Sequence, residues 1–107
     1  MEVTPAEVKR RLDAGEKLRL IDVREVGEHQ TANIEGAELI PMNTVPQRLA
    51  HIEALADEEP VIVFCHHGVR SLNVVSWLRQ QGVANSVSMS GGIEEWSLSI
   101  DPSVPRY

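Results

Sequence analysis

The chain has 107 residues, a formal net charge of −6, 42% hydrophobic residues and one cysteine. A length of this order accommodates one aliphatic core, so we expect residues 1–107 to form a single domain. The lone cysteine excludes an internal disulfide, the acidic balance argues against nucleic acid or an anionic membrane as a partner, and no segment approaches the roughly 20 apolar residues of a membrane span.

Two capping patterns predict helices in the first half of the chain. Thr4 has the position of a helix N-cap, and Pro5 that of a proline at the first helical position. Thr44 and Gln47 have the spacing of a capping box, and the apolar face that follows runs through residues 45–56. The sequence therefore predicts one helix from Pro5 and another over residues 45–56.

Short apolar runs predict strands at residues 18–23, 37–40, 61–64 and 86–89. The polar segment 24–36 is expected to be irregular apart from a turn of helix near residues 25–28. Helical patterns over residues 71–81 and 93–97 follow the last two strands. This alternation predicts an α/β domain with a central, mostly parallel sheet and helices on both faces. In such sheets, ligands bind beyond the carboxyl ends of the strands.

Cys65 lies at such an end, directly after the uniformly apolar strand 61–64. A short loop with Gly68 and Arg70 follows, and the next helix is expected to start at Ser71. A thiol is nucleophilic as the thiolate, and a free thiol titrates at about pH 8.5. A neighbouring arginine, a helix N-terminus and loop N–H groups all favour the anion. The pattern thus indicates a reactive sulfur rather than a structural cysteine.

Two other chemistries use similar residues. Cys65, His66 and His67 are adjacent and cannot easily surround one tetrahedral ion, so no metal site is expected. A cysteine-dependent phosphatase also places a loop and an arginine after a strand, but its loop is one residue longer than the segment from Cys65 to Arg70. Phosphate needs donors for three peripheral oxygens, whereas a shorter loop fits a single sulfur atom. The loop length therefore favours sulfur chemistry.

Four sequence elements, in this order and spacing, resemble the signatures of single-domain sulfurtransferases of the rhodanese family. They are residues 20–24 followed by Glu28, residues 33–37 followed by Ile40 and Pro41, residues 65–71, and residues 90–93 followed by Trp96. The resemblance covers nearly the whole chain and implies a single rhodanese-like domain. Asn33 stands where many relatives carry histidine.

The resemblance implies sulfur transfer without a cofactor. The Cys65 thiolate would take the outer sulfur of a small anionic donor such as thiosulfate and pass it from a persulfide to cyanide or a thiol. An alternative is a persulfide carrier or binding module that accepts sulfur from a protein desulfurase, or that reacts with a thioredoxin-like reductant. A phosphatase or an arsenate reductase is less favoured, and arsenate reduction usually needs a second thiol. Because the first residues lack a signal-peptide pattern, the expected compartment is the cytoplasm.

The expected site residues fall into three groups. Cys65 is the nucleophile. The active-site loop that binds the substrate comprises His66, His67, Gly68, Val69, Arg70 and Ser71. Residues expected to support the loop are Asp22, Arg24, Gly91 and Gly92. Arg70 is expected to stabilise the thiolate and attract an anionic donor, or to pair with a carboxylate that closes the loop. Glu28 is given a structural role only.

Overall fold

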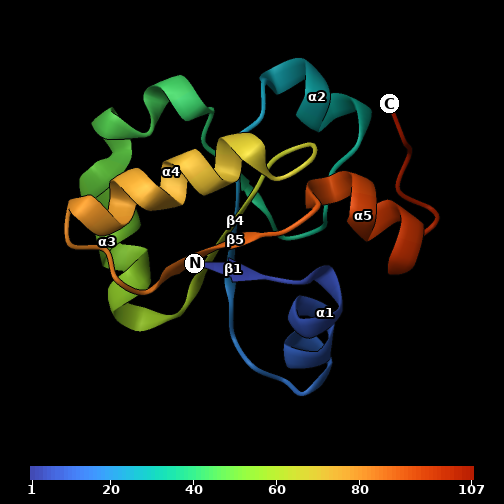
Figure 1. Cartoon of the computed structure of the whole chain (residues 1–107), viewed down its shortest axis with the longest axis horizontal. Helices are drawn as coiled ribbons and strands as arrows, with labels where there is room; N and C mark the ends of the chain where they lie inside the picture. Colours follow the sequence, from blue (N-terminus) through green and yellow to red (C-terminus); the bar gives the residue numbers. More distant parts are fainter.

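A computed structural model describes all of residues 1–107 and places a parallel sheet between two layers of helices (Figure 1). The five strands are β1 (Glu2–Val3), β2 (Arg19–Asp22), β3 (Glu38–Leu39), β4 (Val61–Phe64) and β5 (Ser86–Met89). Their order is β1-β5-β4-β2-β3, and every pair is parallel. The predicted α/β class with a parallel sheet is confirmed.

The helices are α1 (Pro5–Asp13), α2 (Val26–Thr31), α3 (Leu49–Glu58), α4 (Val69–Gln80) and α5 (Gly92–Ser99). Two 3₁₀ turns, η1 (Met42–Thr44) and η2 (Pro46–Arg48), precede α3. Figure 1 shows α3 and α4 on one side of the sheet and α1 and α5 on the other. None of these helices has the length and apolarity that a membrane crossing requires.

The central strand β4 pairs with β2 on one side and β5 on the other, and it is fully buried because helices cover both faces of the sheet. Alternate side chains of β4 enter two separate cores. Val63 packs with residues of α3 and α4, and Phe64 packs with residues of α1 and α5. Full burial of a side chain of this size contributes roughly 1.5–3 kcal/mol, so the two cores fix β4, and with it the start of the next loop.

The helix predicted over residues 45–56 begins later than expected. The Thr44 hydroxyl donates to the Pro41 carbonyl at 2.8 Å instead of capping a helix. The chain then makes the two 3₁₀ turns, and regular α-helix starts only at Leu49. The expected cap at Thr4 does form, because its hydroxyl accepts from the Glu7 N–H at 3.1 Å.

Two further elements differ from the sequence prediction. The segment expected to be mostly irregular contains α2, which starts after a capping box in which the Glu28 carboxylate accepts from the Glu25 N–H at 3.1 Å. The edge strand β1 has only two residues and was not predicted. It exists through its pairing with β5, and its own sequence carries no strand periodicity.

The loop between β5 and α5 packs directly against the segment that follows β4. The Ile93 N–H donates to the Cys65 carbonyl at 2.9 Å, and the Glu94 N–H donates to the His66 carbonyl at 3.1 Å. Gly92 adopts a φ of +61°, and a Cβ there would overlap those same two carbonyl oxygens. Glycine at this position therefore permits the close approach of the two loops.

We predict that Gly92→Ala destabilises the protein more than Gly36→Ala. Gly36 has a φ of +87° with open space around it, so alanine there costs about 1 kcal/mol of backbone strain. Alanine at Gly92 adds the displacement of two carbonyls, for a total of about 3 kcal/mol. Urea unfolding of both variants measures the difference. If both variants lose the same unfolding free energy, the β5–α5 loop and the segment after β4 are not held in close contact.

Candidate active site

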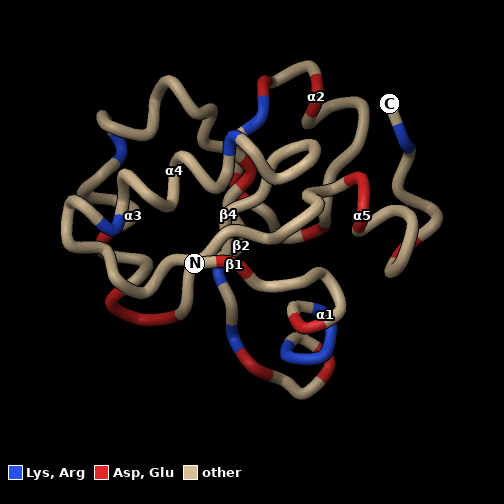
Figure 2. The backbone as a smooth tube through the Cα atoms, viewed as in Figure 1, with Lys and Arg blue, Asp and Glu red and all other residues tan.

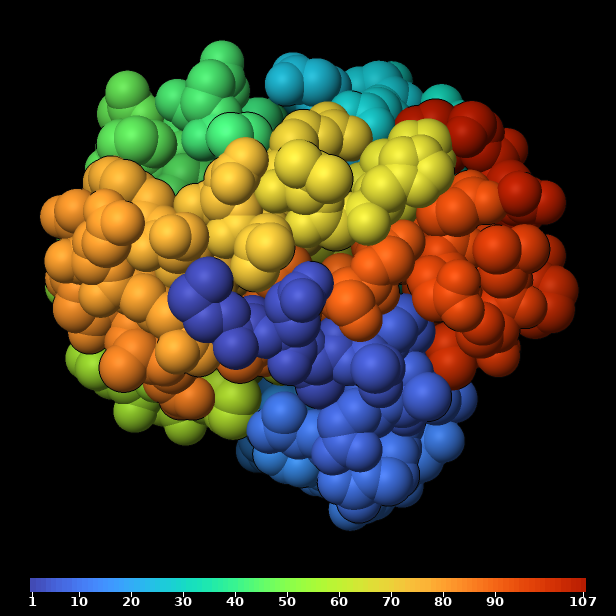
Figure 3. Space-filling view, viewed as in Figure 1, coloured from blue at the N-terminus to red at the C-terminus, as the bar shows by residue number.

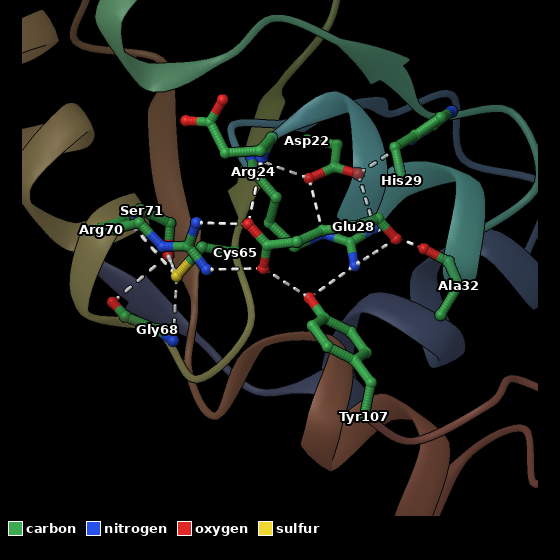
Figure 4. A network of polar contacts seen from close by, with 11 residues as sticks. Asp22, Arg24, Glu28, His29, Ala32, Cys65, Gly68, Arg70, Ser71 and Tyr107 are labelled. Atoms are coloured by element: carbon green, nitrogen blue, oxygen red, sulfur yellow. Dashed lines mark hydrogen bonds and ion pairs between the residues drawn. The ribbon is translucent and has the colours of Figure 1, made fainter.

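Cys65 lies at the carboxyl edge of the sheet, one residue beyond β4 and four before α4 begins (Figure 4). The turn that leads into α4 depends on Gly68, whose φ is +106°. A Cβ at this position would lie 3.2 Å from the Gly91 nitrogen. The glycine thus allows the tight turn that brings the first residues of α4 back over the cysteine.

Backbone donors converge on the sulfur of Cys65. The Gly68 N–H donates to Sγ at 3.1 Å, and the Ser71 N–H donates to Sγ at 3.4 Å. The first N–H groups of a helix have no acceptor within the helix, and the positive end of the α4 dipole also faces this sulfur. The loop is therefore built to stabilise negative charge on Sγ.

A serine hydroxyl completes the surroundings of the sulfur. The Ser71 Oγ lies 3.5 Å from Sγ of Cys65, is buried, and is also bonded to the Gly68 carbonyl at 3.2 Å. The Ser88 hydroxyl, which comes from β5, lies 2.7 Å from the Ser71 hydroxyl. This pair links the sulfur to the neighbouring strand, and a hydroxyl that can turn either way can donate to an anionic sulfur.

The sulfur is nearly closed to solvent. Only 1% of Cys65 is exposed, and none of the surface hollows is lined by residues 65–71. The burial differs from that of an inert core cysteine, because amides point at the sulfur instead of away from it.

Behind the loop, Asp22 and Arg24 form a completely buried ion pair. Arg24 donates to both carboxylate oxygens of Asp22, at 2.8 and 2.7 Å. Its other guanidinium N–H groups bind the carbonyls of Glu28 and Ala32 and the Tyr107 hydroxyl. All five donors of this arginine are used, so the pair holds α2 and the C-terminal segment in place (Figure 4).

Arg70, the arginine of the loop, pairs with Glu28 from α2. Its two terminal nitrogens contact the two carboxylate oxygens at 2.8 and 3.0 Å. Hydrogen bonds from Arg70, with smaller contributions from the Glu25 N–H and the Tyr107 hydroxyl, lower the pKa of Glu28 to about 2. The same pairing raises the pKa of Arg70. This fork is the carboxylate contact considered for Arg70 in the sequence analysis.

The C-terminal segment covers one side of the loop. The Tyr107 ring stacks on His66, which in turn stacks on His67, with 3.9 Å between ring centroids in each pair. Figure 3 shows this segment, in red, against the yellow loop and the cyan α2 region. Burial and the charge of His67 lower the pKa of His66, whose Nε2 has no hydrogen-bond partner. The Glu94 carboxylate lies 3.8 Å from this nitrogen and opposes the shift, so the net lowering of the pKa favours the neutral imidazole.

The structure brings some of the predicted residues to the sulfur and places others behind it or on the surface. Gly68 and Ser71 contact it directly, while Gly92 and Asp22 act through the backbone and through Arg24. Others lie away from the sulfur. The Val69 side chain is 70% exposed. Asn33, noted above only for its place in the family signature, donates to the His29 carbonyl at 3.2 Å on the surface. No cluster of three metal-ligating side chains occurs in the structure.

Three residues at the site were missed or undervalued in the sequence analysis. Glu28 binds the loop arginine, Tyr107 donates to Glu28 at 2.8 Å, and Ser88 binds the Ser71 hydroxyl. The capping box that Glu28 forms with Glu25 could have indicated a helix facing the loop. No sequence signal identifies Tyr107, because its contacts span 79 and 83 residues.

We predict that Glu28 stabilises the fold only above acidic pH. Its pKa falls from 4.5 to about 2 on folding, so its contribution is complete above pH 4.5 and is lost as the pH falls toward 2. Relative to Glu28→Gln, the wild type should be about 2 kcal/mol more stable at neutral pH, after allowance for partial exposure, and the gap should close in acid. Urea unfolding across this range tests it, with the exposed Glu35→Gln as control. A difference in unfolding free energy between wild type and Glu28→Gln that does not change with pH contradicts the lowered pKa of Glu28.

Comparison with known proteins agrees with this geometry. Residues 4–99 match the family model described as a rhodanese-like domain. The adenylyltransferase and sulfurtransferase MOCS3-2 of Zea mays is 33% identical over 98% of this chain, but the chain spans only 23% of that protein. YtwF of Bacillus subtilis is 34% identical, with 94% of each chain covered.

A solved structure supports the same relationship. The human single-domain sulfurtransferase TSTD1 superposes with a TM-score of 0.77 at 28% identity, covering 92% of this chain and 96% of its own. The matched region includes the strand, the cysteine loop and the glycine pair that anchors the loop. The chain therefore belongs to the rhodanese-like domain family, in which MOCS3-2 and TSTD1 are named as sulfurtransferases.

Proposed function

We propose that this protein is a sulfurtransferase that carries sulfane sulfur as a persulfide on Cys65. The observation that carries the proposal is the convergence of the Gly68 and Ser71 N–H groups on Sγ, at 3.1 and 3.4 Å. Donors at these distances stabilise a thiolate before transfer and a persulfide after it. The family relationship supports the same reaction class.

The reaction has two halves that balance without a redox partner. In the first, the Cys65 thiolate attacks the outer sulfur of a sulfane donor, a new S–S bond forms on Sγ, and the donor's own bond to that sulfur breaks. The leaving group takes the electron pair; for thiosulfate it is sulfite. In the second, a thiol or cyanide attacks the transferred sulfur and releases the Cys65 thiolate.

A phosphatase reaction has less support from the same loop. A phosphoryl group needs donors for three oxygens and an acid for the leaving group. The carbonyls of Cys65 and His66 are bound by the first turn of α5, and Arg70 is engaged by Glu28. Two loop N–H groups, those of Gly68 and Ser71, donate to Sγ, which suits one transferred sulfur better than a phosphoryl group.

The proposal predicts that the reduced protein gains the mass of one sulfur atom when incubated with a sulfane donor. Intact-mass measurement after exposure to several donors, thiosulfate among them, gives the result directly. Cys65→Ser should gain nothing, and a phosphate ester should not be hydrolysed by either protein. If the folded protein gains no sulfur from any of these donors, the proposed function is wrong.

We also predict that Ser71→Ala slows persulfide formation by about tenfold, because a hydroxyl 3.5 Å from Sγ no longer stabilises the anion. Ser88→Ala is the matched control. It removes the partner of the Ser71 hydroxyl at 2.7 Å and leaves the contact with Sγ in place. Single-turnover rates of both variants separate the two effects. If they slow transfer equally, the Ser71 hydroxyl acts only through its link to β5.

A further inference from the structure

Resting on the proposed function, we infer that Tyr107 is a positioning residue for sulfur transfer, which holds both ends of the loop from Cys65 to Arg70 in place. The tyrosine makes no hydrogen bond with Sγ. Its hydroxyl acts on Arg70 through Glu28, and its ring acts on His66, the residue after the nucleophile. Tyr107 lies beyond the residues that the family model matches, so the family relationship assigns it no role.

The hydroxyl of Tyr107 joins the two arginine–carboxylate pairs of the site. It donates to Oε2 of Glu28 at 2.8 Å and accepts from Arg24 at 2.7 Å. Arg24 is a fixed support, because its side chain is completely buried and bound to both oxygens of Asp22. The same Oε2 of Glu28 accepts from Arg70 at 3.0 Å. A second, anchored donor keeps this oxygen in place, so the hydroxyl fixes the point to which Arg70 is bound.

The ring of Tyr107 holds the other end of the loop by stacking. Its centroid lies 3.9 Å from that of His66, and the two ring planes differ by 9°. The Glu94 N–H binds the His66 carbonyl at 3.1 Å, which fixes the backbone of His66 but not its side chain. Nε2 of the imidazole has no hydrogen-bond partner. Stacking against Tyr107 and His67 therefore orients the His66 ring.

The segment that carries Tyr107 is attached to α5 by contacts that do not involve the tyrosine side chain. The Ser97 hydroxyl donates to the Val104 carbonyl at 2.6 Å, and the Val104 side chain is buried in one of the two cores. Arg106 donates to Glu94 at 2.7 Å, and in Figure 2 the blue stretch near the C-terminal end lies beside the red first turn of α5. Because Tyr107 belongs to neither core, substitutions of its side chain leave this attachment in place.

Holding the loop matters for the reaction because the donors around the sulfur belong to the loop backbone. Gly68, whose N–H binds Sγ at 3.1 Å, lies between the two positions that Tyr107 holds. Such donors stabilise a transition state most when they need no rearrangement at the moment of reaction. A loop held at both ends keeps them directed at Sγ, whereas a loose loop must be ordered in every turnover. Tyr107 should thus affect the rate of bond formation more than the binding of the donor.

Two substitutions separate the ring from the hydroxyl. Tyr107→Phe keeps the stack on His66 and removes the hydrogen bonds to Glu28 and Arg24, whereas Tyr107→Ala removes both. Single-turnover loading uses thiosulfate, or cysteine persulfide where thiosulfate does not load the wild type. We expect the limiting rate of persulfide formation to fall about tenfold in Tyr107→Ala and about threefold in Tyr107→Phe. The donor concentration at half the limiting rate should change by less than about twofold in both variants.

Leu98→Ala is the matched control. It also truncates a half-exposed side chain, 53% exposed against 42% for Tyr107, on α5 and outside both cores, and it should load at the wild-type rate. Urea unfolding of every variant checks that each is folded under the assay conditions. A wild-type rate in Tyr107→Phe overturns the role of the hydroxyl whether or not Tyr107→Ala folds.

A double-mutant comparison tests the path through His66. In a His66→Ala background the stack is already absent, so Tyr107→Ala removes only the hydroxyl contacts. Its effect on the limiting rate should therefore shrink from about tenfold to about threefold. An effect that stays the same in both backgrounds shows that the ring does not act through His66.

The outcomes separate this inference from the proposed function. A Tyr107→Ala protein that loads at the wild-type rate, or that is slowed only through a higher half-saturating donor concentration, overturns the positioning role while Cys65 is still loaded. An equal loss in Leu98→Ala overturns it as well, because the effect is then one of surface truncation. If Tyr107→Phe is as slow as Tyr107→Ala, the ring takes no part and Tyr107 does not hold both ends of the loop. Only a wild type that forms no persulfide with any donor removes both the inference and the proposed function.

Discussion

The arrangement of the site depends on two backbone hydrogen bonds made by the first turn of α5. They hold the carbonyls of Cys65 and His66, which would otherwise be buried without a donor. In a trans peptide the carbonyl and the following N–H point in opposite directions, so binding these carbonyls fixes the peptide planes of the loop. The turn at Gly68 can then direct its own N–H and that of Ser71 to Sγ. A glycine pair distant in sequence thus determines the surroundings of the sulfur.

The elements that the sequence predicted well are those whose pattern is local and strong. The uniformly apolar run of β4 identified a strand covered on both faces, and the Thr4 cap identified the start of α1. The elements it predicted poorly take their form from distant contacts. β1 requires β5 as its partner, and the start of α3 was displaced because the Thr44 hydroxyl binds Pro41 instead of the helix. Capping residues indicate a possible helix start, and tertiary contacts decide whether it is used.

The site divides in the same way. The placement of Cys65, Gly68 and Ser71 follows from one continuous segment, so spacing alone brings them together. The partner of Arg70 does not follow from that segment, because Glu28 precedes it by 42 residues and reaches it only through the position of α2. Tyr107 enters from the opposite end of the chain and lies beyond residues 4–99, which the family model covers. The sequence therefore identified Arg70 as a site residue but did not predict that Glu28 pairs with it.

That distinction matters because the charge of an arginine and its capacity to donate hydrogen bonds are separable. In Arg24 the charge is paired with Asp22, and all five N–H groups have acceptors. In Arg70 the charge is paired with Glu28 through two nitrogens only, which leaves further N–H groups for another acceptor. A guanidinium of this kind can donate to a further acceptor while its charge is balanced by Glu28. Arg70 can therefore tie the loop to α2 and still offer N–H groups to another acceptor.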